Sequence, residues 1–198
     1  MNTIENSMNE LILASTSPWR KQILENAGFT VTAIASNVDE SRCVERDPKL
    51  HAAILARWKA QAVFERFPDA VVIGADQVMW DGRRVCGKPK DASAHFDMLA
   101  RLRGQTHWLH TAFVILGPNI DEHRVVSSAL TMRGDLSDRE LKAYVDTGEG
   151  RFCAGGYAIE GHGSWLFESI DGDWLNIIGL PVLDVVSCLR GHGWTYGT

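Results

Sequence analysis

The 198-residue chain contains few cysteines, and they lie far apart. Cys43, Cys86, Cys153 and Cys188 include no C-x-x-C pair, and no histidines stand at the spacing of a zinc site. A disulfide framework is not expected in a chain of this length with 45% apolar residues to fill a core. We expect the four thiols to be reduced and structural.

The chain also lacks an excess of positive charge. Its formal net charge is −5 at pH 7, with 20 lysines and arginines against 25 acids. A protein with this balance has no long-range attraction for a polyanion, so sequence-independent binding to nucleic acid is not expected. An anionic ligand would have to be bound by a local cluster of cations.

No apolar run approaches the roughly 20 residues needed to cross a bilayer. Residues 1–10 are polar and carry no apolar core, so they suit neither a signal peptide nor an anchor. We expect a cytoplasmic protein with no membrane partner. Residues 1–10 are expected to form a flexible tail, with Met8 as an alternative start, and residues 11–198 a single domain of two lobes.

What the chain does contain is a series of apolar segments separated by glycine, proline and capping residues. Apolar runs and alternation predict strands at 11–14, 29–35, 71–78, 106–116, 124–132 and 164–170. Helical spacing and caps predict helices at 18–27, 48–67, 91–102, 137–147 and 181–189. Strands and helices alternate in the first half and cluster in the second. This order indicates an α/β fold, with a mixed twisted sheet flanked by helices and a central cleft between two lobes.

The most informative stretch is the apolar run 71–78, which reads as a buried strand carrying one carboxylate, Asp76. Gly74 lets another backbone or a ligand come close. The Asp81-Gly82 pair favours a hairpin, which would bring Lys88 towards Asp76. A base and a cation on one rigid unit suit an enzyme that handles an anionic substrate.

A second candidate site follows the apolar run 11–14. Ser15 opens a hydroxyl-rich loop, Ser17 is a suitable N-cap, Pro18 is a suitable first helical residue, and Arg20 lies in the first turn. Free amides, the helix dipole and a guanidinium would all favour an anion there. The alternative is that the serines only cap the helix.

Two further pieces are weaker when taken alone. Asp39 and Glu40 are adjacent acids, a pattern that is usually a solvated turn. Lys59 lies beside the apolar stripe of the predicted helix 48–67, so it either reaches a cleft or extends along the surface. The glycine-rich stretches match no P-loop, no dinucleotide-binding loop and no nucleophile elbow. Together the pieces indicate phosphate recognition beside a carboxylate that can hold a divalent metal or activate water.

At these residues the sequence resembles the Maf family of nucleoside triphosphate pyrophosphatases. The resemblance runs from Leu11 to about Leu189, and its blocks stand in the family's order: 11–20, 38–40, 56–60, 73–78, 87–89, 153–157 and 179–181. It implies a Maf-type catalytic domain over 11–198, with a fold of the Maf/inosine-triphosphatase kind. It also implies a divalent metal, Mg²⁺ or Mn²⁺, and hydrolysis of a nucleoside triphosphate to the monophosphate and pyrophosphate.

The resemblance suggests a role for each candidate residue. Asp76 is expected to be the general base for water attacking the α-phosphorus, and to share the metal with Glu40. The triphosphate is expected to be held by Ser15, Arg20, Lys59 and Lys88. We also expect a homodimer, the general tendency of compact enzymes.

Three residues depart from the common family pattern. Most of the family has arginine in place of Trp19, threonine in place of Gln77 and lysine in place of Cys153. The branch that resembles 7-methyl-GTP pyrophosphatases shares all three, together with an acid like Glu160. A 7-methylated guanine is cationic, so an indole face attracts it by about 0.5–2 kcal/mol where an arginine would repel it. We therefore expect Trp19, Gln77 and Glu160 to choose the base.

Four alternatives stay open. The first is a dTTP/UTP pyrophosphatase, and the second is a nucleotide-binding regulator of cell division without catalysis. The third is a structural or interaction protein, which would tolerate the loss of Asp76, Lys59 and Lys88. The fourth concerns Trp19 alone, which would then be only a core residue of its helix.

Overall fold

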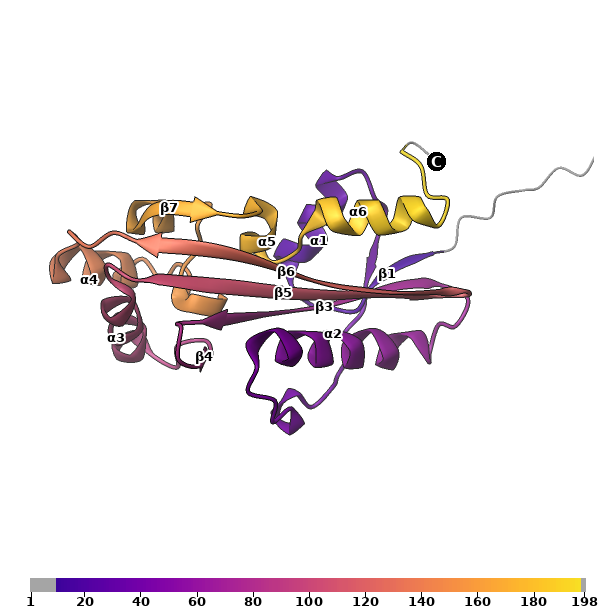
Figure 1. The fold of residues 1–198 in the computed structure, drawn as a ribbon, viewed down its shortest axis with the longest axis horizontal. Coiled ribbons are helices and arrows are strands. Elements are labelled where there is room, and N and C mark those ends of the chain that lie inside the picture. Colours follow the sequence, from indigo (N-terminus) through magenta and orange to yellow (C-terminus); the bar gives the residue numbers. More distant parts are fainter. Residues whose placement is uncertain (1–9, 197–198) are drawn as a thin grey trace, which may run out of the picture.

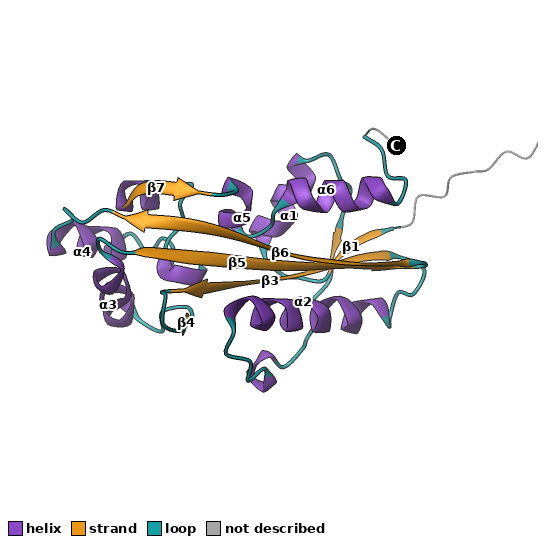
Figure 2. Ribbon diagram, viewed as in Figure 1, coloured by secondary structure: helices purple, strands orange, loops and turns teal. Residues whose placement is uncertain are grey.

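The computed structural model describes residues 10–196, which fold around one seven-stranded mixed sheet flanked by helices (Figures 1 and 2). The strands are β1 (Leu11–Leu13), β2 (Thr32–Ala33), β3 (Val71–Trp80), β4 (Val85–Cys86), β5 (Thr106–Gly117), β6 (Ile120–Met132) and β7 (Phe167–Asp171). The helices are α1 (Pro18–Asn26), α2 (Pro48–Phe64), α3 (Ala92–Leu102), α4 (Asp138–Asp146), α5 (Trp174–Ile178) and α6 (Val182–Gly191). Three short 3-10 helices are η1 (Glu40–Arg42), η2 (Ala154–Gly156) and η3 (His162–Leu166). The predicted α/β class is confirmed.

The sheet is mixed because strands pair in parallel at one edge and antiparallel over the rest. β1 pairs in parallel with β2 and β3, whereas β3, β5, β6 and β7 pair antiparallel in that order. β3, β5 and β6 are the long strands, and they run along the length of the molecule (Figure 1).

Helix α2 lies unusually close to one face of the sheet. A Cβ on Gly74 of β3 would stand 2.5 Å from the carbonyl oxygen of Ala56 and 2.5 Å from the amide nitrogen of Ala60, both in α2. Only glycine on the strand and small side chains on the helix allow this approach. The close contact brings Lys59 of α2 to the strand residue Asp76.

The other face carries two hydrophobic clusters side by side. Alternate residues of a strand point to the same face, so Ile73, Gln77 and Met79 of β3 share it. Ile73 belongs to a cluster that includes side chains of α1 and α6, and Met79 to a cluster that includes side chains of α3 and α4. These two clusters would be the cores of the two predicted lobes. Gln77 is the polar residue of the strand between them.

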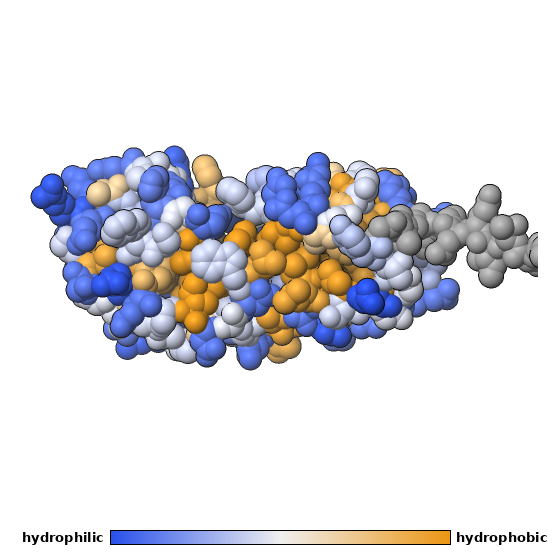
Figure 3. Space-filling model, turned by 90° about the horizontal axis from the view of Figure 1, so that it is seen from above, coloured by the Kyte–Doolittle hydropathy of each residue, from blue (hydrophilic) through white to orange (hydrophobic). Residues whose placement is uncertain are grey.

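The surface of the molecule on the upper side of Figure 1 is polar at its borders and apolar at its centre. Figure 3, which views the molecule from above, shows orange side chains gathered along the middle, with blue residues around them. Exposed apolar residues of α5 and α6 include Trp174 and Leu183.

The outer edge of β3 has a gap. β1 pairs with residues 71–73 and β4 with residues 79–80, so among the described residues no strand pairs with 74–78 on that edge. Backbone groups there are free to meet side chains or a ligand. Polar side chains can therefore gather beside residues 74–78 of β3.

Local signals predicted several elements correctly. The Ser17 side chain accepts a hydrogen bond from the Arg20 amide, Asp91 caps α3, and Ser137 with Glu140 forms a capping box at the start of α4. Gly82 has a φ of 90° in the turn between β3 and β4, as expected for the predicted hairpin. All four cysteines are free.

Other boundaries differ from the prediction. β6 begins at Ile120 and not at residue 124, because Pro118 and Asn119 make a tight turn and the charged residues that follow pair with other elements. Asp121 binds Arg57 of α2, and Arg124 binds Asp184 of α6. The strand predicted at 29–35 is only Thr32–Ala33, since its partner β1 is itself three residues long.

The predicted strand 164–170 begins late and is followed by an unpredicted helix. Ser164 bonds to Gly161 through both its amide and its hydroxyl, which winds 162–166 into η3. Asp173 caps α5. α2 ends at Phe64, three residues before the predicted end.

The two ends of the chain lie largely outside the described residues. Of the predicted tail 1–10, only Glu10 is described, and its carbonyl oxygen accepts a hydrogen bond from the Val71 amide. Within residues 10–196, no helix is both long and apolar enough to cross a bilayer.

Candidate active site

A cleft of about 440 Å³ opens where β3 lacks an edge partner. Its walls come from the start of α1, from η1 and α2, from β3, from the segment after β4, from residues 152–160 and from the end of α5. The predicted site residues that line it are Trp19, Arg20, Glu40, Lys59, Asp76, Gln77, Lys88 and Glu160. The fold thus brings together residues that are up to 141 positions apart, from Trp19 to Glu160.

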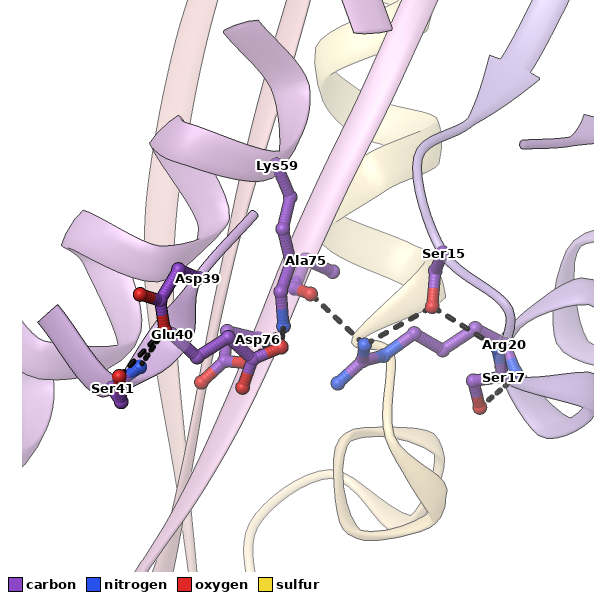
Figure 4. A network of polar contacts seen from close by, with 9 residues as sticks. All are labelled: Ser15, Ser17, Arg20, Asp39, Glu40, Ser41, Lys59, Ala75 and Asp76. Atoms are coloured by element: carbon purple, nitrogen blue, oxygen red, sulfur yellow. Dashed lines mark hydrogen bonds and ion pairs between the residues drawn. The ribbon is translucent and has the colours of Figure 1, made fainter. Parts of the chain in front are cut away.

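Lys59 and Asp76 form a buried ion pair at the centre of this cleft. The Lys59 Nζ lies 2.6 Å from Asp76 Oδ1 and 2.8 Å from Glu40 Oε1, so one ammonium joins both carboxylates (Figure 4). Lys59 and Asp76 are 8% and 7% exposed, whereas Glu40 is exposed. Lys59 is therefore held in the cleft and does not extend along the surface. Asp76 Oδ2 remains available to a ligand.

The two acids predicted as a pair have separate roles in the structure. Asp39 caps η1, because its Oδ1 accepts hydrogen bonds from the Ser41 amide and hydroxyl at 3.2 and 2.6 Å. That cap turns the Asp39 carboxylate to Ser41 and leaves Glu40 to meet Lys59 (Figure 4).

Arg20 reaches the gap in β3 from the side opposite Lys59 (Figure 4). Its guanidinium donates to the Ala75 carbonyl at 2.9 Å and to the Gly179 carbonyl at 3.0 Å. Burial lowers the pKa of the Arg20 guanidinium, while the nearby Asp76 and Glu40 carboxylates raise it. Two cations thus stand on either side of the strand that carries the central carboxylate.

Ser15 supports Arg20 from behind. The Ser15 Oγ accepts hydrogen bonds from the Ser17 amide at 3.2 Å and from Arg20 Nη1 at 3.4 Å. Ser15 is buried and is not among the residues lining the cleft, whereas Ser17 is. A direct contact between Ser15 and substrate therefore stays a prediction.

Gln77 has a fixed side-chain orientation. Its Nε2 donates to the carbonyl oxygens of Asn176 at 2.7 Å and Ile177 at 3.3 Å, and lies 3.0 Å from Thr111 Oγ1. Backbone carbonyls can only accept, so the amide nitrogen must face them. The Gln77 Oε1 is then the atom left to accept a hydrogen bond from a ligand in the cleft.

The rim of the cleft carries Trp19, Lys88, Cys153 and Glu160. Trp19 is 48% exposed, so it is not a core residue of α1. Burial raises the pKa of the Cys153 thiol, as does the Glu160 carboxylate, with Lys88 acting in the opposite sense. A raised pKa keeps this thiol neutral near pH 7. Lys88 shares the cleft with Asp76, although no bond joins the two in the described part of the chain.

Comparison with known proteins assigns the chain to a family. Residues 10–192 match the family model described as "Maf-like protein". The chain belongs to the Maf family. A "7-methyl-GTP pyrophosphatase" of Rhizobium etli is 41% identical over 194 residues, which cover 93% of this chain and 96% of that protein. A "dTTP/UTP pyrophosphatase" of Geobacillus sp. strain WCH70 is 37% identical over 187 residues, covering 94% and 100%.

A solved structure of the Staphylococcus aureus Ham1 protein is also similar. It covers 64% of this chain and 73% of its own, with a TM-score of 0.46 and 15% identity.

The Maf family implies a divalent metal, and two carboxylates of this chain fit one. Mg²⁺ is usually held by one or two carboxylates together with substrate phosphates. Asp76 and Glu40 supply two, both within 2.8 Å of the same ammonium. Within residues 10–196, no group of three or more His, Cys, Asp or Glu side chains could hold a metal. A metal at this Maf site would therefore need phosphate oxygens to complete its coordination.

Sequence reasoning missed the side chains that support the Maf segment 150–160. The Tyr157 hydroxyl lies 2.7 Å from Nε2 of His107, which is fully buried, and His95 Nε2 bonds to the Gly156 carbonyl. Gly155 has a φ of 84°, and a Cβ there would stand 2.6 Å from the Tyr157 ring. The glycine-rich pattern was the available signal, but it does not predict which distant side chains contact this segment.

Proposed function

We propose that this protein hydrolyses 7-methyl-GTP, or a similarly modified purine nucleotide, to the monophosphate and pyrophosphate. The broader statement, a nucleoside triphosphate pyrophosphatase acting on a phosphoric anhydride bond, is supported by membership of the Maf family and by relatives with that name. The choice of base is the finer part of the proposal.

The reaction needs a base, a nucleophilic water and cations for the leaving group. Asp76 is positioned to take a proton from water through Oδ2, since Oδ1 is bound by Lys59. The water oxygen then forms a bond to the α-phosphorus as the bond to the bridging oxygen of the pyrophosphate breaks. Arg20, Lys59 and Lys88 would stabilise the charge on that departing group.

A divalent metal held by Asp76, Glu40 and the phosphates would polarise the phosphoryl oxygens. Lys59 already joins the two carboxylates and keeps them together in the free protein. The chain itself therefore holds its two acids close before a ligand arrives.

The observation that carries the choice of base is the orientation of Gln77. With Nε2 bound to backbone carbonyls, Gln77 presents an acceptor, and the Glu160 carboxylate on the same cleft is also an acceptor. Guanine has two neighbouring donors on its pairing edge, N1–H and the N2 amine, which match two acceptors. Trp19 offers an indole face to the cationic 7-methylated ring.

The second candidate, dTTP or UTP, is favoured by the relatives so named at 36–38% identity. Thymine and uracil have one donor between two acceptors, so the same two protein acceptors would leave a polar group unpaired. A regulator that binds nucleotide without hydrolysis would use the same cleft and release no pyrophosphate.

The test is a panel of 7-methyl-GTP, GTP, dTTP and UTP with Mg²⁺, read as released pyrophosphate. We expect 7-methyl-GTP to have the highest kcat/KM. Asp76→Asn should lower kcat by about 100-fold or more, because general-base catalysis contributes on that order, while circular dichroism shows an intact fold. A higher rate with dTTP or UTP would reject the base assignment. An active Asp76→Asn protein would remove Asp76 from the mechanism.

A further inference from the structure

Phe152 is an exposed aromatic residue outside the buried clusters. Its side chain is 76% exposed at the rim of the cleft. Other strongly exposed aromatic residues in 10–196, such as Trp165 and Tyr196, lie away from this cleft. Among the large exposed apolar side chains of the described region, only Trp19 and Phe152 line it.

These two aromatic residues come from different lobes. Trp19 is in α1, whose Ile23 and Leu24 belong to the cluster with α6. Phe152 lies between α4 and η2, in the segment that continues to Tyr157 and Ile159 of the other cluster. The cleft therefore has an aromatic side chain from each lobe.

The Phe152 backbone is held by its neighbours. The Cys153 amide donates to the Gly150 carbonyl at 2.9 Å, and the Gly156 amide donates to the Cys153 carbonyl at 3.2 Å. Tyr157, which follows in the sequence, is held by the hydrogen bond between its hydroxyl and the buried His107. The Phe152 ring therefore extends from a turn whose backbone is held by hydrogen bonds. The Arg151 guanidinium lies over one face of that ring, 5.4 Å from its centroid, which leaves the opposite face for a ligand.

We propose that Phe152 is a specificity-determining residue that stacks on the purine base, with Trp19 on the base's other side. The inference rests on the proposed function and adds to it a second aromatic surface. A bicyclic purine offers more stacking area than a pyrimidine, and each base–aromatic contact contributes about 1–3 kcal/mol. The cationic 7-methylguanine ring gains further from two aromatic faces.

The test uses the full chain with Phe152→Leu and Phe152→Trp, and Trp165→Ala as the matched control. Leucine keeps apolar volume without a ring, and tryptophan keeps a ring. For Phe152→Leu we expect the KM for 7-methyl-GTP to rise about tenfold, with kcat nearly unchanged and a smaller change for UTP. Phe152→Trp should keep the low KM, and Trp165→Ala should match the wild type.

Binding of the product 7-methyl-GMP, measured by calorimetry, separates this inference from the proposed function. If the wild type hydrolyses no triphosphate, the proposed function fails, and the stack is still decided by comparing 7-methyl-GMP binding to wild type and Phe152→Leu. An unchanged dissociation constant in Phe152→Leu, or an equal loss with 7-methyl-GMP and UMP, overturns the stack. A selective loss with the purine, restored in Phe152→Trp, supports it.

Discussion

At the scale of single residues, Lys59 determines the electrostatics of the cleft. It lies between two carboxylates that would otherwise repel each other, within 2.6 and 2.8 Å of their oxygens. A metal ion held by Asp76 and Glu40 has to share this space with an ammonium of the same sign. We therefore expect Lys59 to oppose metal binding in the absence of a triphosphate, and the phosphate charge to offset this opposition.

We predict that Lys59→Met strengthens binding of Mn²⁺ to the nucleotide-free protein. One unit charge at 4 Å contributes about 4 kcal/mol at an effective dielectric constant of 20, so a gain of about tenfold or more is expected even after relaxation. Electron paramagnetic resonance of free Mn²⁺ measures the gain. Pyrophosphate release should fall in the same variant, because a cation for the leaving group is lost.

Lys142→Met on the exposed surface of α4 is the control for Lys59→Met, and its Mn²⁺ affinity should equal that of the wild type. Equal Mn²⁺ affinities for Lys59→Met and the control would show that the ammonium does not oppose the metal.

The sequence predicted the identities of the central residues better than their neighbours. Asp76, Lys59 and Arg20 gather because each lies on a well-defined element whose pattern is local. The inward position of Ser15 and the separate role of Asp39 depend on which hydrogen bonds close in three dimensions. Phe152 was missed because an aromatic residue in a loop gives no periodic signal.

At the scale of elements, the contact between β3 and α2 places Lys59 against Asp76. We predict that Gly74→Ala destabilises the protein by about 1–3 kcal/mol, because the new methyl group would overlap α2 backbone atoms at 2.5 Å. Chemical denaturation measures this loss. Gly191→Ala is the matched control, since a Cβ there meets nothing within 4 Å. If Gly74→Ala is as stable as the control, the helix is not held against the strand.

Helices and strands were predicted correctly where the signal was local. The predictions failed where pairing between strands determined the length of a strand. Helix starts at Ser17, Asp91 and Ser137 are set by a cap within three residues. Strand lengths depend on the partner: β2 is short because β1 is short, and β6 is long because β5 extends to the turn. No window of sequence contains that information.

At the scale of the whole molecule, His107 couples stability to pH. Burial lowers the pKa of His107 from 6.5 to about 4, and its Nδ1 has no partner in the described structure. Between these two values the unfolded chain binds a proton that the folded chain does not. Above pH 6.5, His107 should therefore not reduce the free energy of unfolding. Between pH 6.5 and pH 4, its protonation in the unfolded chain should lower that free energy by about 3 kcal/mol.

We predict that His107→Gln reduces this pH dependence, as measured by urea denaturation from pH 7 to pH 4. Part of the dependence should remain, because burial also lowers the pKa of His110. His123→Gln on exposed β6 is the control, and it should keep the wild-type difference because His107 is still present. A His107→Gln curve parallel to that of the wild type would contradict the assignment.

The class of the whole molecule was predictable, but its assembly was not. Alternating and then clustered elements indicated a mixed sheet with helices on both sides, and the structure confirms it. The division of one face into two cores could not be read locally, because Ile73 and Met79 belong to the same strand. The homodimer stays a prediction.

The long strands have a mechanical consequence. β3, β5 and β6 pass through both lobes without a break, and each contributes to the sheet that supports both cores. We expect lobes joined in this way to rotate little about each other, because a sharp bend would break the ladder of backbone hydrogen bonds. Adjustment to a nucleotide then falls to the segments after β4 and after α4. We therefore expect the sheet to fix the depth of the cleft, and the two segments at its rim to move most.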